Sequence, residues 1–329
     1  MARVFSGIQP SGEIHIGNWL GALRNWVALQ DEHDCLYCIV DQHALTGNYD
    51  AAGLAGRTLE MAIGLLATGV DPERSSLFVQ SHVPAHTTLS WLLTTIAPLG
   101  ELERMTQYKD KADRLESIPA GLLCYPVLMA ADILVYRAEA VPVGEDQLQH
   151  LELSRELARK WNHAFSPDRP FFPEPQPIVT GAKRIVGLDG SAKMSKSLGN
   201  TIGITESPEQ IWAKLRPAMT DPARVTKQDP GTPEICNIYS LHRHFSPPDT
   251  VAHVATQCRS AGWGCIDCKR VLADNMVSTL APMRERALEL SAHPEQVTTV
   301  LGDGAATARR LAAETMHEVT DRMGFLPEV

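Results

Sequence analysis

The chain has 329 residues, of which 44 % are hydrophobic and 21 % charged, so it is an ordinary globular protein with room for one large α/β domain and a smaller one. Its formal net charge of −9 excludes a uniformly basic nucleic-acid-binding protein, and any RNA contact must be a local patch of Lys and Arg. The candidates for such a patch are Lys183, Arg184, Lys214, Arg216, Arg224, Lys227, Lys269 and Arg270, and for each of them singly we expect a solvated surface charge. The first residues do not form a basic and apolar leader, so we expect a cytoplasmic protein.

The first half of the chain alternates between short apolar runs and helical patterns. Buried strands are predicted at 3–8, 35–41, 76–80, 140–143 and 184–186, and helices at 17–31, 51–69, 86–97, 119–138 and 144–162. This alternation predicts a parallel sheet with right-handed helical crossovers, in which ligands bind at the carboxyl ends of the strands. The Pro-rich stretch 166–177 is predicted to be a loop.

A glycine-rich turn, SGIQPSGEIHIGN at 6–18, follows the first predicted strand and opens the first predicted helix. Strand, turn and helix N-terminus in this order form an anion site, because glycines admit close backbone approach and the N–H groups at a helix end face the ligand. His15 would direct a ring nitrogen at a phosphate. Such a turn alone is a weak signal, and a lone histidine is more often structural.

One predicted helix carries a possible binding face. Helical spacing places Tyr125, Met129 and Asp132 on the same side, and Asp132 is the single charge in the apolar run 122–136. A buried carboxylate either stays protonated or meets a specific donor, and an indole N–H is such a donor. Met129 could equally be core, and Asp132 could pair with a backbone group or a basic neighbour. The run is shorter than the roughly 20 clean apolar residues of a membrane span, so no membrane contact is expected.

The pentapeptide Lys-Met-Ser-Lys-Ser at 193–197 lies between Gly190 and Gly199. Two lysines three residues apart can reach neighbouring phosphate oxygens, and their small neighbours allow the loop to close over a triphosphate and reopen. A solvated basic turn is the alternative for an isolated lysine-rich loop. In one chain with the turn at 6–18, the pentapeptide favours ATP as the ligand.

After residue 193 the pattern is helical, with helices predicted at 207–216, 233–244, 248–260, 264–290 and 305–323. Cys236, Cys258, Cys265 and Cys268 form a C-x21-C-x6-C-x2-C array in this part. In a cytoplasmic chain this spacing favours a metal over disulfides, with scattered small core residues as the alternative. Zinc and a 4Fe–4S cluster both accept four cysteines, so the ligand count does not decide between them.

The two ATP-related motifs are typical of one enzyme family. Residues 15–18 (HIGN) form a variant of the HIGH signature and residues 193–197 an intact KMSKS signature, so the sequence resembles class I aminoacyl-tRNA synthetases. More closely it resembles the bacterial tryptophanyl-tRNA synthetases, through SGIQPSG at 6–12, IVDQHALT at 39–46, GELERMTQ at 100–107, LMAADIL at 128–134 and VPVGEDQ at 141–147. Asn18 replaces the last histidine of HIGH, so a double-histidine phosphate clamp does not carry over.

The resemblance implies an α/β fold: a Rossmann-like parallel-sheet nucleotide-binding domain with the HIGH and KMSKS motifs, plus a smaller all-helical domain. The catalytic domain would cover 1–188, the anticodon-binding domain with the cysteines 189–292, and a last helix at about 293–325 would pack back on the catalytic domain. A homodimer is implied, and we place part of its interface at 100–107.

The resemblance also implies the activity. ATP activates L-tryptophan to tryptophanyl-adenylate with release of pyrophosphate, and tryptophan then passes to the 3′ end of tRNA(Trp). The residues implied in catalysis are Lys193, Lys196, His15 and Gln9. Those implied in binding ATP, with Mg²⁺ on the phosphates, are Gln9, Pro10, Ser11, Gly17, Asn18, Gly144, Glu145, Asp146, Ile185, Lys193, Met194, Ser195, Lys196 and Ser197. Those implied in binding tryptophan are Asp132, Phe5, Gly7, His43, Tyr125, Met129, Val141, Val143 and Gln147.

Some relatives carry a 4Fe–4S cluster on a similar cysteine pattern, so we prefer iron–sulfur to zinc for Cys236, Cys258, Cys265 and Cys268. Three rival interpretations stay open. They are a tyrosine-specific synthetase, a nucleotidyltransferase that adenylates a metabolite, and a non-enzymatic iron–sulfur protein that binds RNA or acts as a sensor.

Overall fold

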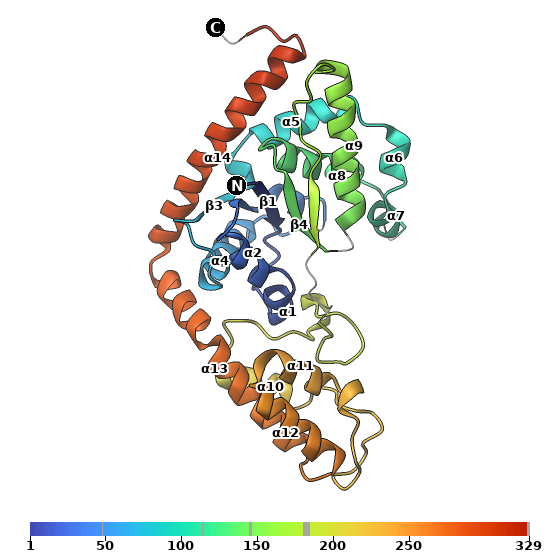
Figure 1. Cartoon of the computed structure of the whole chain (residues 1–329), viewed down its shortest axis with the longest axis vertical. Coiled ribbons are helices and arrows are strands. Elements are labelled where there is room, and N and C mark those ends of the chain that lie inside the picture. The colour runs from blue at the N-terminus through green and yellow to red at the C-terminus, as the bar shows by residue number, and fades with distance from the viewer. Residues whose placement is uncertain (48, 114, 145–146, 180–184, 328–329) are drawn as a thin grey trace. The chain divides into compact units, whose positions relative to one another are not determined.

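The computed structural model describes residues 1–47, 49–113, 115–144, 147–179 and 185–327 (Figure 1). The chain forms two compact units. The first comprises Met1–Gly12, Arg24–Gly181 and His293–Val329, and the second comprises Glu13–Leu23 and Ala182–Ala292. The HIGH-type segment therefore belongs to the same unit as the helical part of the chain, not to the unit of the sheet.

The first unit contains a parallel five-stranded sheet of order β3-β2-β1-β4-β5, so the predicted parallel sheet is confirmed. Its strands are β1 Arg3–Ile8, β2 Asp34–Ile39, β3 Ser75–Val79, β4 Ala140–Val143 and β5 Gln176–Val179. β1 is central and pairs with β2 over its whole length. Its carboxyl end therefore lies in the middle of the sheet, where predicted ligand-binding residues follow it.

The fifth strand differs from the prediction. The expected strand at 184–186 is wrong: in the described part of this stretch, Val186 forms only an isolated bridge with Lys193. The actual fifth strand, β5, begins inside the predicted loop at 166–177. Pro177 suggested a loop because it lacks an N–H, but β5 is an edge strand, where proline is tolerated.

Helices surround this sheet in the first unit (Figure 1). They are α2 Arg24–Leu29, α3 Asp41–Ala44, α4 Leu54–Ala67, α5 Ala85–Thr94, α6 Leu99–Glu103, α7 Thr106–Ala112, α8 Ala120–Leu134, α9 Leu148–Phe165 and α14 Pro294–Arg322, with a 3₁₀ turn at Gln80–His82. No helix in the described part of the chain is long and apolar enough to span a membrane. The apolar helix α8 is instead buried in the core of this unit.

α8 ends four residues before its predicted boundary because the chain turns there. The N–H of Arg137 donates to the carbonyl of Leu134, and the N–H of Ala138 donates to that of Ile133. Arg137 has φ of 51°, the left-handed conformation that closes a helix C-terminus. The termination is therefore a backbone feature that the apolar pattern does not reveal.

The C-terminal helix α14 packs along the edge strand β3, beside which it runs in Figure 1. Gly304 permits this approach, because a Cβ at that position would lie 2.0 Å from the carbonyl oxygen of Leu77. The helix thus covers a strand edge that would otherwise expose unpaired backbone groups.

Gly304→Ala should destabilise the protein by about 2 kcal/mol or more, because the new methyl group overlaps backbone atoms that cannot move aside. Gly302 in the same helix is the matched control, since a Cβ there meets no heavy atom within 4 Å. Gly302→Ala should stabilise the protein by up to about 1 kcal/mol. Urea unfolding of the two variants measures both effects, and equal shifts would contradict the packing of α14 on β3.

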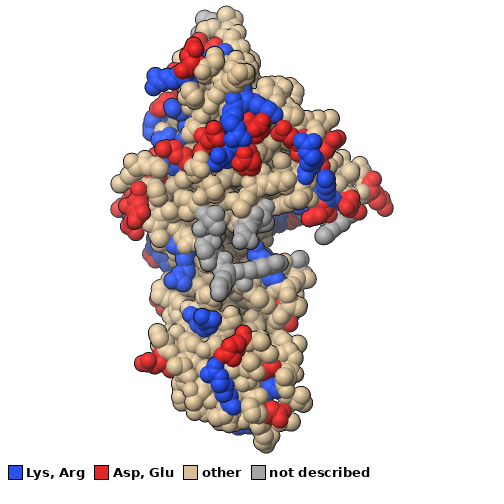
Figure 2. Space-filling view, turned by 45° about the vertical axis from the view of Figure 1, so that its right-hand side comes forward, with Lys and Arg blue, Asp and Glu red and all other residues tan. Residues whose placement is uncertain are grey.

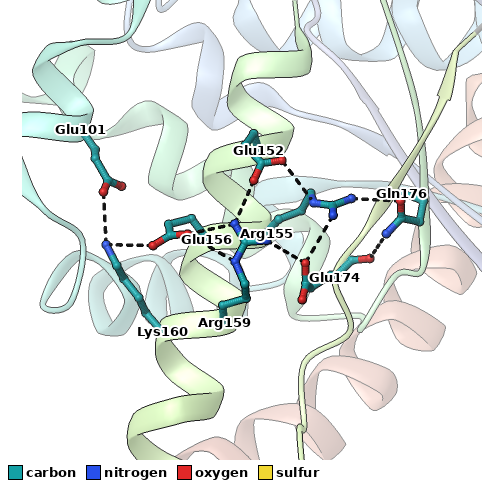
Figure 3. Close-up of polar contacts among 8 residues, drawn as sticks. All are labelled: Glu101, Glu152, Arg155, Glu156, Arg159, Lys160, Glu174 and Gln176. Carbon is teal, nitrogen blue, oxygen red and sulfur yellow. Dashed lines mark hydrogen bonds and ion pairs between the residues drawn. The ribbon is translucent and has the colours of Figure 1, made fainter.

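The exposed face of α9 carries an ion-pair network (Figure 3). Arg155 donates to Gln176 of β5 over 3.0 Å, and Arg159 donates over 2.8 Å to Glu174, which precedes that strand. The network thereby ties the edge strand to α9. Each exposed pair contributes little on its own. On the face shown in Figure 2, basic and acidic side chains are interspersed.

The second unit is helical, as predicted, apart from its loops. Its elements are α1 Ile16–Asn18, a π-helical turn Trp19–Leu23, α10 Pro208–Leu215, α11 Asn237–Phe245, α12 Pro248–Arg259, α13 Cys265–Ala292 and 3₁₀ turns at Lys196–Leu198 and Pro233–Ile235. The helix predicted at 17–31 is thus divided into α1, the π-helical turn and α2. The regular apolar spacing does not disclose the change of helical geometry.

Candidate active site and cysteine site

The second unit brings the two predicted ATP motifs together. The N–H of Ile16 donates to the carbonyl of Ile202 over 2.9 Å, and that of Ile204 donates to Ile14 over 3.0 Å. Residues 14–16 therefore pair with the segment that directly follows the KMSKS loop. A Cβ at Gly17 would lie 3.3 Å from the Cβ of Met194, so the absence of a side chain at Gly17 lets the motifs meet.

His15 is the N-cap of α1. Its Nδ1 accepts hydrogen bonds from the N–H groups of Gly17 (3.1 Å) and Asn18 (3.3 Å). Asn18 completes a capping box, because its side-chain oxygen accepts from the N–H of His15. The pKa of His15 is lowered to about 4 by burial and, less strongly, by the charges of Lys196 and Lys193. Near neutral pH the ring is therefore uncharged, with its hydrogen on Nε2, which suits it to donate to an anion.

Asn200 holds the KMSKS loop, a role that the sequence did not suggest. Its side-chain oxygen accepts from the N–H of Ser195 over 2.7 Å, and its side-chain amide donates to Asp189 over 3.0 Å. Lys193 and Lys196 are exposed, whereas Met194 is buried. The loop therefore presents its lysines to solvent while its centre is anchored. The side chain of Ser197 lies outside the described residues.

The other residues expected to bind ATP belong to both units. Ile185 is buried and its carbonyl accepts from the N–H of Met194 over 3.2 Å, within the second unit. Gln9, Pro10, Ser11 and Gly144 follow β1 and β4 in the first unit. Glu145 and Asp146 lie outside the described residues.

Asp132 of α8 lies among three donors in the first unit and is 1 % exposed. His43 Nε2 is 2.8 Å from Oδ2, while His86 Nδ1 and Gln80 Nε2 are 2.6 Å and 2.7 Å from Oδ1. Although burial opposes ionisation, the charge of His43 and its hydrogen bond, followed by the hydrogen bond and charge of His86, lower the pKa of the Asp132 carboxyl to about 2. Of the alternatives that the sequence left open for Asp132, pairing with basic neighbours is found, because two of its three donors are His43 and His86.

The remaining residues predicted to bind tryptophan lie near this carboxylate or along β1 and β4. The rings of His43 and Tyr125 meet edge to face with centroids 6.4 Å apart. The Tyr125 hydroxyl is 2.9 Å from His150 Nε2, and His150 Nδ1 is 3.0 Å from the side-chain oxygen of Gln147. These contacts link Gln147 to Tyr125 through a histidine that the sequence analysis missed.

The apolar members of the set are Phe5, Val141 and Val143, which are buried, and Met129, which is partly buried against the same core. Gly7 is exposed at the end of β1, where a Cβ would lie 2.8 Å from Val40 Cγ1. A side chain there would be forced against Val40, which directly follows β2, and this accounts for the glycine.

All four predicted cysteine ligands line one cavity in the second unit, together with Arg224 and Trp263. Burial and the neighbouring thiolates raise the pKa of Cys268 to about 12. Cys268 Sγ lies 3.4 Å from His242 Nε2, and a guanidinium nitrogen of Arg224 lies 3.9 Å from Cys258 Sγ. Within the described residues, no group of three or more His, Cys, Asp or Glu side chains is arranged to hold a metal ion.

Several lysines and arginines considered for RNA contact have other partners. Lys269 is 5 % exposed, and its ammonium donates to the carbonyls of Arg216 (2.8 Å) and Ala218 (2.7 Å). The expectation of a surface charge at Lys269 is therefore wrong, because this side chain caps the end of α10. Arg270 stacks 3.5 Å above the ring of Trp212. Residues 183 and 184 lie outside the described part of the chain.

Comparison with known proteins yields consistent matches. Residues 1–281 match the family "tRNA synthetases class I (W and Y)". The chain is 53 % identical to the tryptophan–tRNA ligase of Deinococcus radiodurans over 99 % of both chains, and 43 % identical to that of Thermotoga maritima over 98 % of this chain and 99 % of the relative. The crystal structure of Campylobacter jejuni tryptophanyl-tRNA synthetase complexed with ADP and tryptophan is similar, with a TM-score of 0.91 and 35 % identity over 98 % of this chain and 100 % of that chain.

Proposed function

The chain belongs to the class I tRNA synthetases of the tryptophan and tyrosine group, and we infer from this that it is a tryptophan–tRNA ligase. The observation that carries the inference is the 53 % identity to a tryptophan–tRNA ligase along 99 % of both chains. The enzyme activates L-tryptophan with ATP, releases pyrophosphate, and transfers tryptophan to the 3′ end of tRNA(Trp).

For tryptophan binding, we propose that Asp132 accepts the indole N–H. The carboxylate is ionised and buried, so an N–H donor at that place is strongly preferred to an apolar group. Phe5, Val141, Val143 and Met129 would enclose the ring, while Tyr125 and Gln147 would hold the α-ammonium and carboxylate. A smaller amino acid would leave both a void and an unpaired carboxylate, so no editing step is required.

For ATP, we propose that Lys193 and Lys196 neutralise the departing pyrophosphate and that His15 and Gln9 contact the phosphates, which also carry Mg²⁺. The tryptophan carboxylate attacks the α-phosphate in line, and both groups are already negative. Positioning and charge stabilisation therefore matter more than proton transfer. Support comes from the uncharged His15 and the two exposed lysines, which act on its pKa.

For the macromolecular partners, we propose that the helical residues 189–292 bind the anticodon end of tRNA(Trp) and that two copies of the chain form a homodimer in the cytoplasm. α6 and the start of α7, within 100–107, would lie in the interface. Trp91 of α5 and Leu99 at the start of α6 are 68 % and 59 % exposed, as expected of a surface that a second copy covers.

Charging of tRNA tests the inferred function. Purified protein incubated with ATP, Mg²⁺, labelled tryptophan and total bacterial tRNA should produce acid-precipitable label that mild base releases. Labelled tyrosine should give none. Absence of tryptophan charging, with intact folding shown by circular dichroism, would refute the function.

We further propose that Cys236, Cys258, Cys265 and Cys268 hold a 4Fe–4S cluster. All four line one cavity, which supports a group shared by the four thiols, and the resemblance to relatives that carry a 4Fe–4S cluster is the reason to prefer iron–sulfur to zinc. When bound, the cluster would crosslink α11, α12 and α13 next to the proposed anticodon region.

Anaerobic purification tests the cysteine proposal. The protein should show absorbance near 400 nm and contain about four irons per chain. Zinc at about one per chain without iron would favour the alternative metal. If protein made anaerobically with iron supplied contains neither iron nor zinc, the four cysteines are core residues and the proposal fails.

A further inference from the structure

The carboxylate of Asp132 is part of a larger buried network that the proposed chemistry does not use. Besides the donors on His43, His86 and Gln80, the network contains Tyr136, whose hydroxyl is 2.7 Å from His86 Nε2. Gln80, His86 and Tyr136 are each 0 % exposed. No solvent reaches these groups, so their hydrogen bonds must satisfy one another.

The proton positions in this network follow from chemistry. An ionised carboxylate only accepts hydrogen bonds, so the nitrogens of His43 and His86 that face Asp132 carry hydrogen. Burial raises the pKa of Tyr136, so its hydroxyl keeps its proton and donates to His86 Nε2. This hydrogen bond fixes the tautomer of His86 that donates to Asp132.

Counting acceptor positions leaves one place for a ligand. Each carboxylate oxygen accepts about two hydrogen bonds. Oδ1 is filled by His86 and Gln80, whereas Oδ2 accepts only from His43 among the described residues. The remaining acceptor position of Asp132 is therefore on Oδ2.

We propose that Tyr136, His86 and Gln80 are positioning residues that saturate Oδ1 of Asp132 and leave Oδ2 for the ring N–H of tryptophan. They thereby set the preference of the enzyme for tryptophan over isosteres that lack this N–H. The proposal rests on the proposed role of Asp132. None of the three residues needs to touch the substrate.

The test compares tryptophan with 3-benzothienylalanine, an isostere in which sulfur replaces the ring N–H. Dissociation constants of both ligands are measured by calorimetry for the full-length protein, and their ratio is the selectivity. In the unmodified protein the isostere should bind about tenfold more weakly or worse. In Tyr136→Phe this selectivity should fall by about threefold to tenfold, because His86 is no longer held in the donating tautomer.

Tyr37→Phe is the matched control. Tyr37 is also fully buried and stacked on an aromatic ring, and its hydroxyl donates to the carbonyl of Trp26 over 2.6 Å, outside the network. Both variants should lose thermal stability, but Tyr37→Phe should keep the selectivity within about twofold. Gln80→Met removes the other donor to Oδ1 and should lower the selectivity as Tyr136→Phe does. It serves as the test variant if Tyr136→Phe does not fold.

The outcomes separate the two proposals. If the unmodified protein binds both ligands equally, Asp132 does not accept the indole N–H and the proposed tryptophan site fails. If the unmodified protein discriminates but Tyr136→Phe and Gln80→Met discriminate equally well, the tryptophan site stands and the positioning role is overturned. A loss of selectivity in Tyr37→Phe of the same size would also overturn it.

Discussion

Lys196→Ala should lower the rate of tryptophan-dependent ATP–pyrophosphate exchange by about 10²-fold or more while tryptophan affinity stays nearly unchanged. Lys196 is exposed at the start of a 3₁₀ turn, and its charge acts on His15 of the other ATP motif. We expect its ammonium to stabilise the charge that develops on the leaving pyrophosphate. Because the side chain is exposed, its removal should leave the fold intact.

Lys227→Ala is the matched control for this lysine. Lys227 is a 68 % exposed lysine of the same unit whose ammonium lies 3.8 Å from Asp267. The exchange reaction needs no tRNA, so this variant should exchange at the normal rate. An unchanged exchange rate in Lys196→Ala would refute the role given to the KMSKS loop.

Asp132→Asn should weaken tryptophan binding by about 10²-fold or more while ATP binding is retained. Asparagine offers one accepting oxygen and one donating amide group where the native carboxylate offers two accepting oxygens. The donors of His43, His86 and Gln80 already require three acceptor positions. The amide would therefore face either a histidine N–H or the indole N–H, donor against donor.

Asp34→Asn provides the comparison, since Asp34 lies at the start of β2 and pairs with Arg3 at the surface over 2.9 Å. Its tryptophan affinity should match that of the unmodified protein. Calorimetric titration with tryptophan measures both variants. Native-like affinity in folded Asp132→Asn would exclude Asp132 from the binding site.

The sequence predicted four of the five strands to within two residues at each end because buried parallel strands appear as short apolar runs. β5 was missed because the prolines before and within it, including Pro177, suggested a loop. Proline is tolerated in an edge strand, but the sequence does not show that this segment lies at the edge of the sheet. The boundary between the two units could not be predicted from the sequence either. Glu13–Leu23 belongs to the second unit through pairing with 202–204, a contact between segments far apart in the chain.

In the candidate site, too, some residues could be predicted from the sequence and others could not. Asp132 could be found as a lone charge in an apolar helix, and His15 and Lys196 from their motifs. His86 and Tyr136 could not, because nothing in their local sequence shows that they converge on Asp132. Gln80 directly follows β3, and its position at the carboxyl end of a parallel strand could have indicated a place in the binding site.

ATP–pyrophosphate exchange measured separately with each of the twenty amino acids tests the central claim most directly. Tryptophan alone should support rapid exchange, with every other amino acid slower by about 10⁴-fold, because only the indole fills the site and pairs with Asp132. Preferential exchange with tyrosine, or no exchange with any amino acid, would contradict the assignment of this chain as a tryptophan–tRNA ligase.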